Sequence, residues 1–319
     1  MGSLIWCVIA YRVGITCPPD PDHTAIQGPG GILIPAVPED LIVGEVEAFA
    51  RDRNIESIPI PGYWIHRDEK LPFESPPSRG EKVFYLCHGG GYVASTTHLE
   101  GVNSRILKGF LQYSQSSTIR RRFAVEYRLS SLSGEPGNGS VSPFLAALVD
   151  ALAGYLYLIK IGFSEEDIIL VGDSAGGSLA LALIRYILSS KEQQSALPNI
   201  PSSLVLFSPW VDLTGQMDEH PDPHSSLTLN AHRDWINTRV LTMDARAFLG
   251  GRPERAELAY RNPYISPASP ILLGLTPDSP TRTVSFNGFP RRFIDNGTFE
   301  CFYDQIRRLG EAIVEDLGE

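Results

Sequence analysis

A serine flanked by small residues is the first feature of this sequence that could do chemistry. The segment Gly172-Asp173-Ser174-Ala175-Gly176 fits the pattern G-x-S-x-G, with the apolar run "DIIL" before it and "SLALALIRYIL" after it. This order predicts a strand, a sharp turn at the serine and then a helix. Small residues around the serine let the turn be tight and lift the hydroxyl clear of the sheet. Ser174 is therefore a candidate nucleophile for attack on a carbonyl carbon.

A second glycine-rich segment, "LCHGGGYV" (86–93), follows the apolar run "KVFYLC" (82–87). Without Cβ atoms, the backbone N–H groups of such a loop can turn toward the negative charge that develops on a carbonyl oxygen. An N–H group at the start of the predicted helix can add another donor. We expect the histidine to brace the loop rather than to act as a base. The predicted oxyanion residues are His88, Gly89, Gly90, Gly91 and Ala175.

The segments "HGGGY" and "GDSAGG", in this order and each after a strand, resemble the hormone-sensitive-lipase branch of the α/β hydrolases. The stretches "PGYWI", "AVEYRLS" and "LFSPWVDLTG" look like those of fungal members. The resemblance runs from about residue 55 to the end of the chain. It implies a serine carboxylesterase that needs no cofactor and acts on small or apolar esters, with deacetylase-like activity as one possibility. Its small-molecule partner would be the ester substrate.

The segment "NGTFECFYDQIRRL" (296–309) resembles the part of the family that carries the catalytic acid. In that match Glu300 takes the place of the acid, and Asp304, one helical turn later, is the alternative. Such an acid holds an imidazole in the correct tautomer and stabilises its charged form. The other interpretation of Glu300 is an acidic residue that stabilises the start of a helix.

The base that should follow the acid is missing, because none of the 19 residues after Glu300 is a histidine. Two hypotheses follow. In the first, the chain is a C-terminally truncated esterase of impaired activity that lacks the final strand and helix. Such a chain would leave the strand at 291–295 as an unprotected sheet edge. In the second, it is a catalytically dead ligand-binding module, like the plant gibberellin receptors that resemble this family.

The pattern of apolar runs predicts an α/β fold, because strands and helices alternate from residue 82 onward. This alternation is typical of a mostly parallel sheet with helices on both faces. Upstream, 39–53 has helical spacing, and 57–65 suggests a short strand pair broken at Pro61-Gly62. The predicted strands are 82–87, 122–127, 168–171, 203–207 and 291–295, and the predicted helices are 99–113, 142–161 and 175–189.

The predicted α/β-hydrolase core spans 55–319, and 1–54 forms an N-terminal segment with cap helices. The alternation of strands and helices is interrupted at about 213–265. We interpret this segment as an insertion that completes a helical cap. Tyr92 and Trp210 are predicted to line the approach to the serine.

Composition narrows the function classes further. The chain has 319 residues, of which 43% are hydrophobic and 20% charged, as in a soluble globular protein. Its net charge of −10 argues against binding to nucleic acid. The one basic cluster, Arg120–Arg122, is interpreted as a solvated entrance to a strand. The oligomeric state is not determined by the sequence.

No membrane span and no metal site are expected. The apolar stretch at 4–11 is too short to cross a bilayer. Two prolines in "HPDPH" (220–224) argue against metal chelation by His220 and His224. The four cysteines lack metal-binding spacing, so reduced thiols in the cytoplasm are the default, although a Cys7–Cys17 bridge stays open for a secreted protein.

Overall fold

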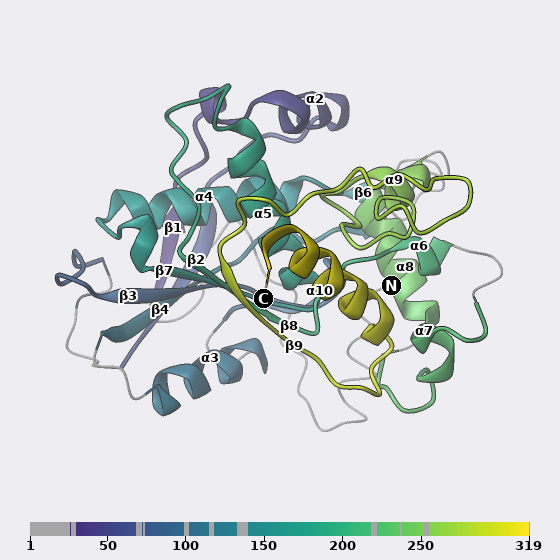
Figure 1. Ribbon diagram of the computed structural model, residues 1–319. Coiled ribbons are helices and arrows are strands. Elements are labelled where there is room, and N and C mark those ends of the chain that lie inside the picture. Colours follow the sequence, from purple (N-terminus) through teal and green to yellow (C-terminus); the bar gives the residue numbers. More distant parts are fainter. Residues whose placement is uncertain are drawn as a thin grey trace.

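The computed structural model describes residues 26, 30–67, 72, 74–98, 102–114, 118–132, 140–217, 222–236, 238–251 and 255–318. Its centre is a seven-stranded sheet in the order β1-β2-β4-β3-β7-β8-β9 (Figure 1). β1 and β2 are antiparallel to their neighbours, and the other five strands run parallel. The strands are β1 (Gly31–Ile34), β2 (Ile60–His66), β3 (Lys82–Cys87), β4 (Ile119–Val125), β7 (Ile168–Asp173), β8 (Ser203–Phe207) and β9 (Arg291–Asp295).

Helices cover both faces of the sheet, which confirms the predicted α/β-hydrolase architecture (Figure 1). One face carries α3 (Val102–Tyr113), whose Phe110 packs against a small apolar cluster around Leu86, Ala124 and Val171. The other face carries the main hydrophobic core and the long helices α4 (Ala146–Lys160), α5 (Ala175–Ser190) and α10 (Tyr303–Leu317).

Short helices fill the chain between β8 and β9, where an insertion was predicted. An aromatic chain joins them to the N-terminal helix α2 (Gly44–Arg53), because Phe144 contacts both Phe49 of α2 (5.7 Å) and Phe248 of α8 (5.6 Å). The division into cap and core stays a prediction. The inserted helices are α6 (Thr214–Met217), α7 (Ser226–Leu229), α8 (Thr238–Leu249) and α9 (Glu257–Arg261), and the small pair β5 (Ser131–Leu132) and β6 (Ser140–Val141) lies against α8.

The strand pair predicted at 57–65 is wrong, because this segment forms the single strand β2 with Pro61 and Gly62 inside it. Pro61 lacks an N–H group, but its carbonyl still accepts a hydrogen bond from Glu126 N (3.0 Å). At Gly62 a Cβ atom would lie 2.3 Å from Cζ of Phe123, so the close packing of β2 on its neighbour requires glycine.

The solvated strand entrance predicted at Arg120–Arg122 is also wrong. β4 begins at Ile119, and the Arg121 and Arg122 side chains are 1% and 0% exposed. Arg121 Nε donates to Glu81 Oε1 (2.7 Å), and the guanidinium lies over the ring of Trp64 at 5.2 Å. Burial lowers the pKa of Arg122 to about 9. For Arg121, ion pairing and ring contacts compensate the burial in ways that a charge pattern does not reveal.

Several predictions concern residues outside the described ranges, namely the apolar stretch at 4–11, Cys7, Cys17 and His220. Within those ranges no helix combines the length and apolar character that crossing a bilayer requires. Cys87 and Cys301 are buried free thiols.

Candidate active site

Ser174 occupies the turn between β7 and α5 in a backbone conformation that few residues other than glycine adopt. Its φ is 51° and its ψ is −118°. Backbone hydrogen bonds hold this turn, because Ser174 N donates to Phe207 O (2.9 Å) and Ser174 O accepts from Trp210 N (3.0 Å). Such conformations cost ~1–3 kcal/mol and are typical of functional sites. The predicted strand, turn and helix around Ser174 are all present.

Three glycines allow this turn to pack tightly. A Cβ atom on Gly172 would lie 2.4 Å from Gly176 O, and one on Gly176 would lie 2.1 Å from Cys87 O. A Cβ atom on Gly177 would lie 2.7 Å from Cβ of Pro209. The helix start is therefore pressed against the end of β3 and the chain after β8.

The glycine-rich loop crosses directly over the serine turn. A Cβ atom on Gly89 would lie 2.5 Å from Asp173 Oδ2 and 3.2 Å from Ser174 Cβ. Gly90 has a φ of 116° and Gly91 a φ of 62°, so both use conformations that glycine favours. Within the described residues, the N–H groups of Gly89 and Gly90 make no hydrogen bond. The structure thus brings the predicted oxyanion loop and the predicted nucleophile together.

His88 is fully buried beneath this loop. Its Nδ1 lies 2.6 Å from Gly89 O, so Nδ1 is the protonated nitrogen, since a carbonyl can only accept. The ring stacks on Tyr127 at 4.1 Å, and the Tyr127 hydroxyl donates to His88 O (2.7 Å). These contacts suit the bracing role predicted for His88.

Glu126, which sequence reasoning missed, supports the same loop. Its Oε1 lies 3.8 Å from His88 Nε2, and its Oε2 accepts from Thr96 Oγ1 (2.7 Å) and Thr97 N (2.8 Å). Burial raises the pKa of Glu126 to about 7, although these hydrogen bonds act in the opposite direction. The available signal was an acidic residue directly after the buried strand, in "AVEYRLS".

Glu300 lies between β9 and α10, close to the serine turn. Its charge adds to burial in raising the pKa of the neighbouring Asp173 to about 6. An asparagine contacts its backbone rather than its carboxylate, since Asn230 Nδ2 donates to Glu300 O (3.0 Å). The buried Oε2 atom has no hydrogen-bond partner within the described residues. A buried carboxylate oxygen in that state can accept a hydrogen bond from a further group.

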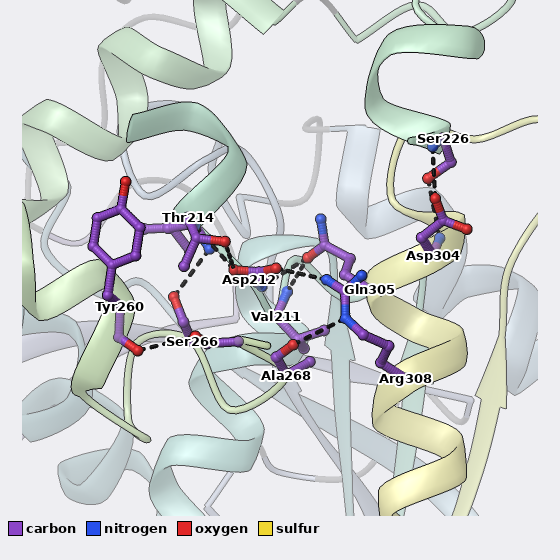
Figure 2. A network of polar contacts seen from close by, with 12 residues as sticks. Val211, Asp212, Thr214, Ser226, Tyr260, Ser266, Ala268, Asp304, Gln305 and Arg308 are labelled. Carbon is purple, nitrogen blue, oxygen red and sulfur yellow. Dashed lines mark hydrogen bonds and ion pairs between the residues drawn. The ribbon is translucent and has the colours of Figure 1, made fainter. Parts of the chain in front are cut away.

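Asp304, the alternative acid, is engaged elsewhere. Its Oδ2 accepts from Ser226 N (2.6 Å), and its own N–H is bonded to Ser226 Oγ (3.0 Å), at the start of α7 (Figure 2). In the described part of the chain, no histidine donates to Glu300 or accepts from the Ser174 hydroxyl. Glu300 therefore lies close to the serine turn, and no described imidazole is bonded to either of them.

Tyr92 and Trp210 lie in the core rather than on an exposed approach to the serine. Tyr92 is 2% exposed and stacks on Phe248 of α8 at 3.9 Å. Trp210 is 0% exposed and stacks on Phe302 at 6.1 Å. The prediction placed both rings along the approach to the serine, but packing against other aromatic rings draws them inward.

A polar network holds the helix that follows Glu300 (Figure 2). Arg308 Nη2 donates to Asp212 Oδ2 (2.6 Å), and Arg308 Nε donates to Ala268 O (3.2 Å). Gln305 Oε1 accepts from the N–H groups of Val211 and Asp212, both at 2.7 Å. α10 is thereby fixed to the chain after β8. Sequence reasoning missed these roles, since no local pattern pairs "PWVDL" with residues 93 or more positions away.

Among the described residues no cluster of three or more His, Cys, Asp or Glu side chains could hold a metal ion. The chemistry available at this site is that of a serine hydroxyl, backbone N–H donors and carboxylates.

Comparison with known proteins agrees with this architecture. A family model described as alpha/beta hydrolase fold matches residues 83–317. An acetyl-hydrolase of Streptomyces hygroscopicus is 28% identical over 236 residues, which cover 74% of this chain and 62% of that protein. An esterase of Acinetobacter venetianus is 40% identical over 169 residues, covering 53% of this chain and 46% of that protein. The chain therefore spans less than two thirds of the length of these relatives.

Solved structures share the fold. An esterase from the bacterial hormone-sensitive lipase family superposes with a TM-score of 0.54 at 24% identity, covering 80% of this chain and 67% of that one. A hormone-sensitive lipase from a metagenome library superposes with a TM-score of 0.53 at 25% identity, covering 91% of this chain and 72% of that one.

Proposed function

Because the chain belongs to the α/β-hydrolase family, we propose that it is a serine ester hydrolase in which Ser174 is the nucleophile. The Ser174 oxygen forms a bond to the ester carbonyl carbon, and the alcohol leaves with a proton. Water then attacks the acyl carbon, the bond to the Ser174 oxygen breaks, and the carboxylic acid product leaves while Ser174 regains its proton. The observation that carries this proposal is the strained turn at Ser174 directly beneath the Gly89 loop.

The backbone donors of Gly89, Gly90 and Ala175 stabilise the tetrahedral oxyanion in this proposal. The N–H groups of Gly89 and Gly90 have no partner among the described residues. The third begins α5, where the helix leaves its first N–H groups unpaired and its dipole favours negative charge. Together they stabilise the transition state more than the uncharged ester.

Glu300 is the proposed acid of the triad, with the task of orienting an imidazole. Its buried, unpartnered Oε2 atom and its closeness to Asp173 support this assignment over Asp304, whose carboxylate accepts from the α7 backbone. No described histidine reaches the pair, so we propose that this chain by itself hydrolyses esters slowly. Shortening of the chain and the likeness to fungal members stay predictions, as does a cytoplasmic location.

Small or apolar esters are the proposed substrates. The acetyl-hydrolase of Streptomyces hygroscopicus and the esterase of Acinetobacter venetianus support an acyl-ester substrate, with an acetyl ester as the first to test. The alternative function is a receptor-like binding module. The observation that favours it is the lack of a described imidazole between Ser174 and Glu300.

Rescue by free imidazole tests the proposal. General base catalysis accelerates a reaction by ~10²–10⁴-fold. A diffusible base that enters beside Glu300 should recover part of this acceleration and raise the hydrolysis rate about tenfold. We expect imidazole to accelerate p-nitrophenyl acetate hydrolysis by the native chain beyond its effect on Ser174→Ala. Glu300→Gln should reduce this rescue, whereas the exposed control Glu311→Gln should not.

Labelling by a fluorophosphonate separates the two functions. A reactive serine gives labelling that Ser174→Ala abolishes. Saturable binding of an apolar ligand, with neither labelling nor imidazole rescue, would support the binding module and contradict the hydrolase.

A further inference from the structure

The loop that carries Glu300 is bonded to a segment that lies far from it in the chain. This loop joins β9 to α10, and its partner is the α7 segment, residues 225–236, which contains α7 and the turns after it. Ser226 Oγ donates to Cys301 O (2.9 Å) and accepts from Asp304 N (3.0 Å). Figure 2 shows Ser226 and Asp304 facing each other where α7 meets α10. The α7 segment therefore holds the end of the loop at which α10 begins.

Two further contacts hold the peptide unit directly after the Glu300 side chain. Asn230 Nδ2 donates to Glu300 O (3.0 Å), and Cys301 N donates to Asp234 Oδ2 (2.8 Å). The Glu300 carbonyl and the Cys301 N–H group belong to the same peptide unit and point in opposite directions. A peptide unit is planar, so contacts on both sides fix the orientation of that plane. The direction in which the Glu300 side chain leaves the backbone is thereby fixed as well.

Asn230 and Asp234 are themselves held in place. Asn230 is 8% exposed, its N–H group donates to Ser226 O (2.9 Å), and its carbonyl accepts from Asp234 N (2.9 Å). The second carboxylate oxygen of Asp234 accepts from Ile236 N (3.1 Å). Groups that are fixed by their own hydrogen bonds can hold a neighbouring group in one geometry.

The Glu300 carboxylate depends on this backbone for its position. Among the described residues none donates a hydrogen bond to the carboxylate, and its buried Oε2 atom has no partner. The Glu300 N–H group donates within the loop, to Gly297 O (3.2 Å). A change at the Glu300–Cys301 peptide unit would therefore move the carboxylate.

We propose that Asn230 and Asp234 are positioning residues for Glu300, which set the direction of its side chain by holding the Glu300–Cys301 peptide unit. Neither residue acts on the reacting atoms. The inference rests on the proposed function, in which Glu300 orients an imidazole, and it extends that function to the α7 segment. A displacement of about 1 Å at a reaction centre can cost ~10²-fold in rate.

Imidazole rescue tests the role of Asn230. Asn230→Ala removes the donor without changing the charge, and it should lower the acceleration of p-nitrophenyl acetate hydrolysis by free imidazole about threefold. Thr228→Ala is the matched control, because Thr228 Oγ1 donates to Asp222 O (2.9 Å) within the same segment and not to the Glu300 loop. An equal loss in both variants would show a general loosening of α7 and overturn the proposal.

A conservative variant separates the hydrogen bond of Asp234 from its charge. Asp234→Asn keeps an oxygen that can accept from Cys301 N, whereas Asp234→Ala does not. We expect Asp234→Ala to lose imidazole rescue as Asn230→Ala does, and Asp234→Asn to regain most of it. Equal losses in the two Asp234 variants would assign the effect to charge and contradict positioning through the peptide unit.

The carboxyl group of Asp173 reports the position of Glu300 without any hydrolysis, because its pKa is raised by burial and by the charge of Glu300. NMR titration should show a lower Asp173 pKa in Asn230→Ala, by about half of the decrease that Glu300→Gln causes, since a released loop moves its carboxylate toward solvent. Thr228→Ala should leave the Asp173 pKa unchanged.

The two measurements separate this inference from the proposed function. A native chain without imidazole rescue, in which Asn230→Ala still lowers the Asp173 pKa, would contradict the hydrolase and support the positioning of Glu300. Imidazole rescue that Asn230→Ala leaves intact, together with an unchanged Asp173 pKa, would overturn the positioning role and leave the hydrolase standing.

Discussion

At the scale of single residues, the site contains two buried carboxyl groups, Glu126 and Asp173, whose pKa values are raised. Glu126 receives three hydrogen bonds on one oxygen, from Thr96 and Thr97, while its other oxygen faces His88. Asp173, beside Ser174, is raised in pKa by burial and by Glu300. Both acids titrate nearer to neutrality than an exposed carboxyl group, so the pH should affect the folded state through them.

Glu126→Gln should change how stability depends on pH. The folded-state pKa of Glu126, about 7, lies above its ordinary value of 4.5, so the folded protein holds the proton more tightly. This contribution is complete below about pH 4.5 and is lost as the pH rises through 7, by about 3 kcal/mol in total. Urea unfolding at pH 5 and pH 8 should therefore show the variant gaining stability relative to the native protein at the higher pH. An identical pH dependence of the two proteins would contradict the burial of a titrating acid here.

At the scale of elements, the position of Glu300 depends on how α10 is attached. The loop before this helix carries Glu300, and the helix itself is tied to the chain after β8 through Asp212, Gln305 and Arg308 (Figure 2). Asp212 is 5% exposed, and burial raises its pKa while the charge of Arg308 lowers it. The ion pair thus offsets part of the desolvation of the carboxylate, whose pKa remains raised.

Arg308→Gln should lower the free energy of unfolding by about 2–3 kcal/mol, because it leaves the Asp212 carboxylate buried without its cation. The adjacent Arg307→Gln is the matched control. Arg307 is 53% exposed and pairs with Glu311 one turn away, so its loss should cost at most ~0.5 kcal/mol.

A double-mutant cycle distinguishes this ion pair from a general packing effect. Arg308→Gln combined with Asp212→Asn should cost clearly less than the sum of the two single changes, as measured by urea unfolding. Additive losses would mean that the two side chains act independently.

At the scale of the whole molecule, the two faces of the sheet are covered unequally. The main core lies on the side of α4, α5 and α10, and the smaller cluster lies under α3 (Figure 1). β8 shows the contrast within one strand, since Leu204 is 1% exposed and the adjacent Val205 is only partly buried. β9, the edge strand, is next to β8, and the less completely covered face of the sheet is the one under α3.

Truncating these neighbouring side chains should reveal the asymmetry. Leu204→Ala should cost about 3 kcal/mol, as expected for a large apolar group removed from a packed core. Val205→Ala, on the opposite face of the same strand, should cost about 1 kcal/mol because less apolar surface is lost. Equal losses in chemical denaturation would show that α3 and the main core cover the sheet equally well.

The sequence by itself determined the order of elements and the turn at Ser174. Spacing of apolar residues located β3, β7, β8 and α5, and the glycines at 172 and 176 required a turn too tight for larger residues, because these are local constraints. Only the tertiary structure decided the partners: burial of Arg121 and Arg122, Glu126 behind His88, the inward stacking of Tyr92 and Trp210, and Arg308 on Asp212. Burial and ion pairing join residues far apart in the chain, and their energies depend on surroundings that no local pattern encodes.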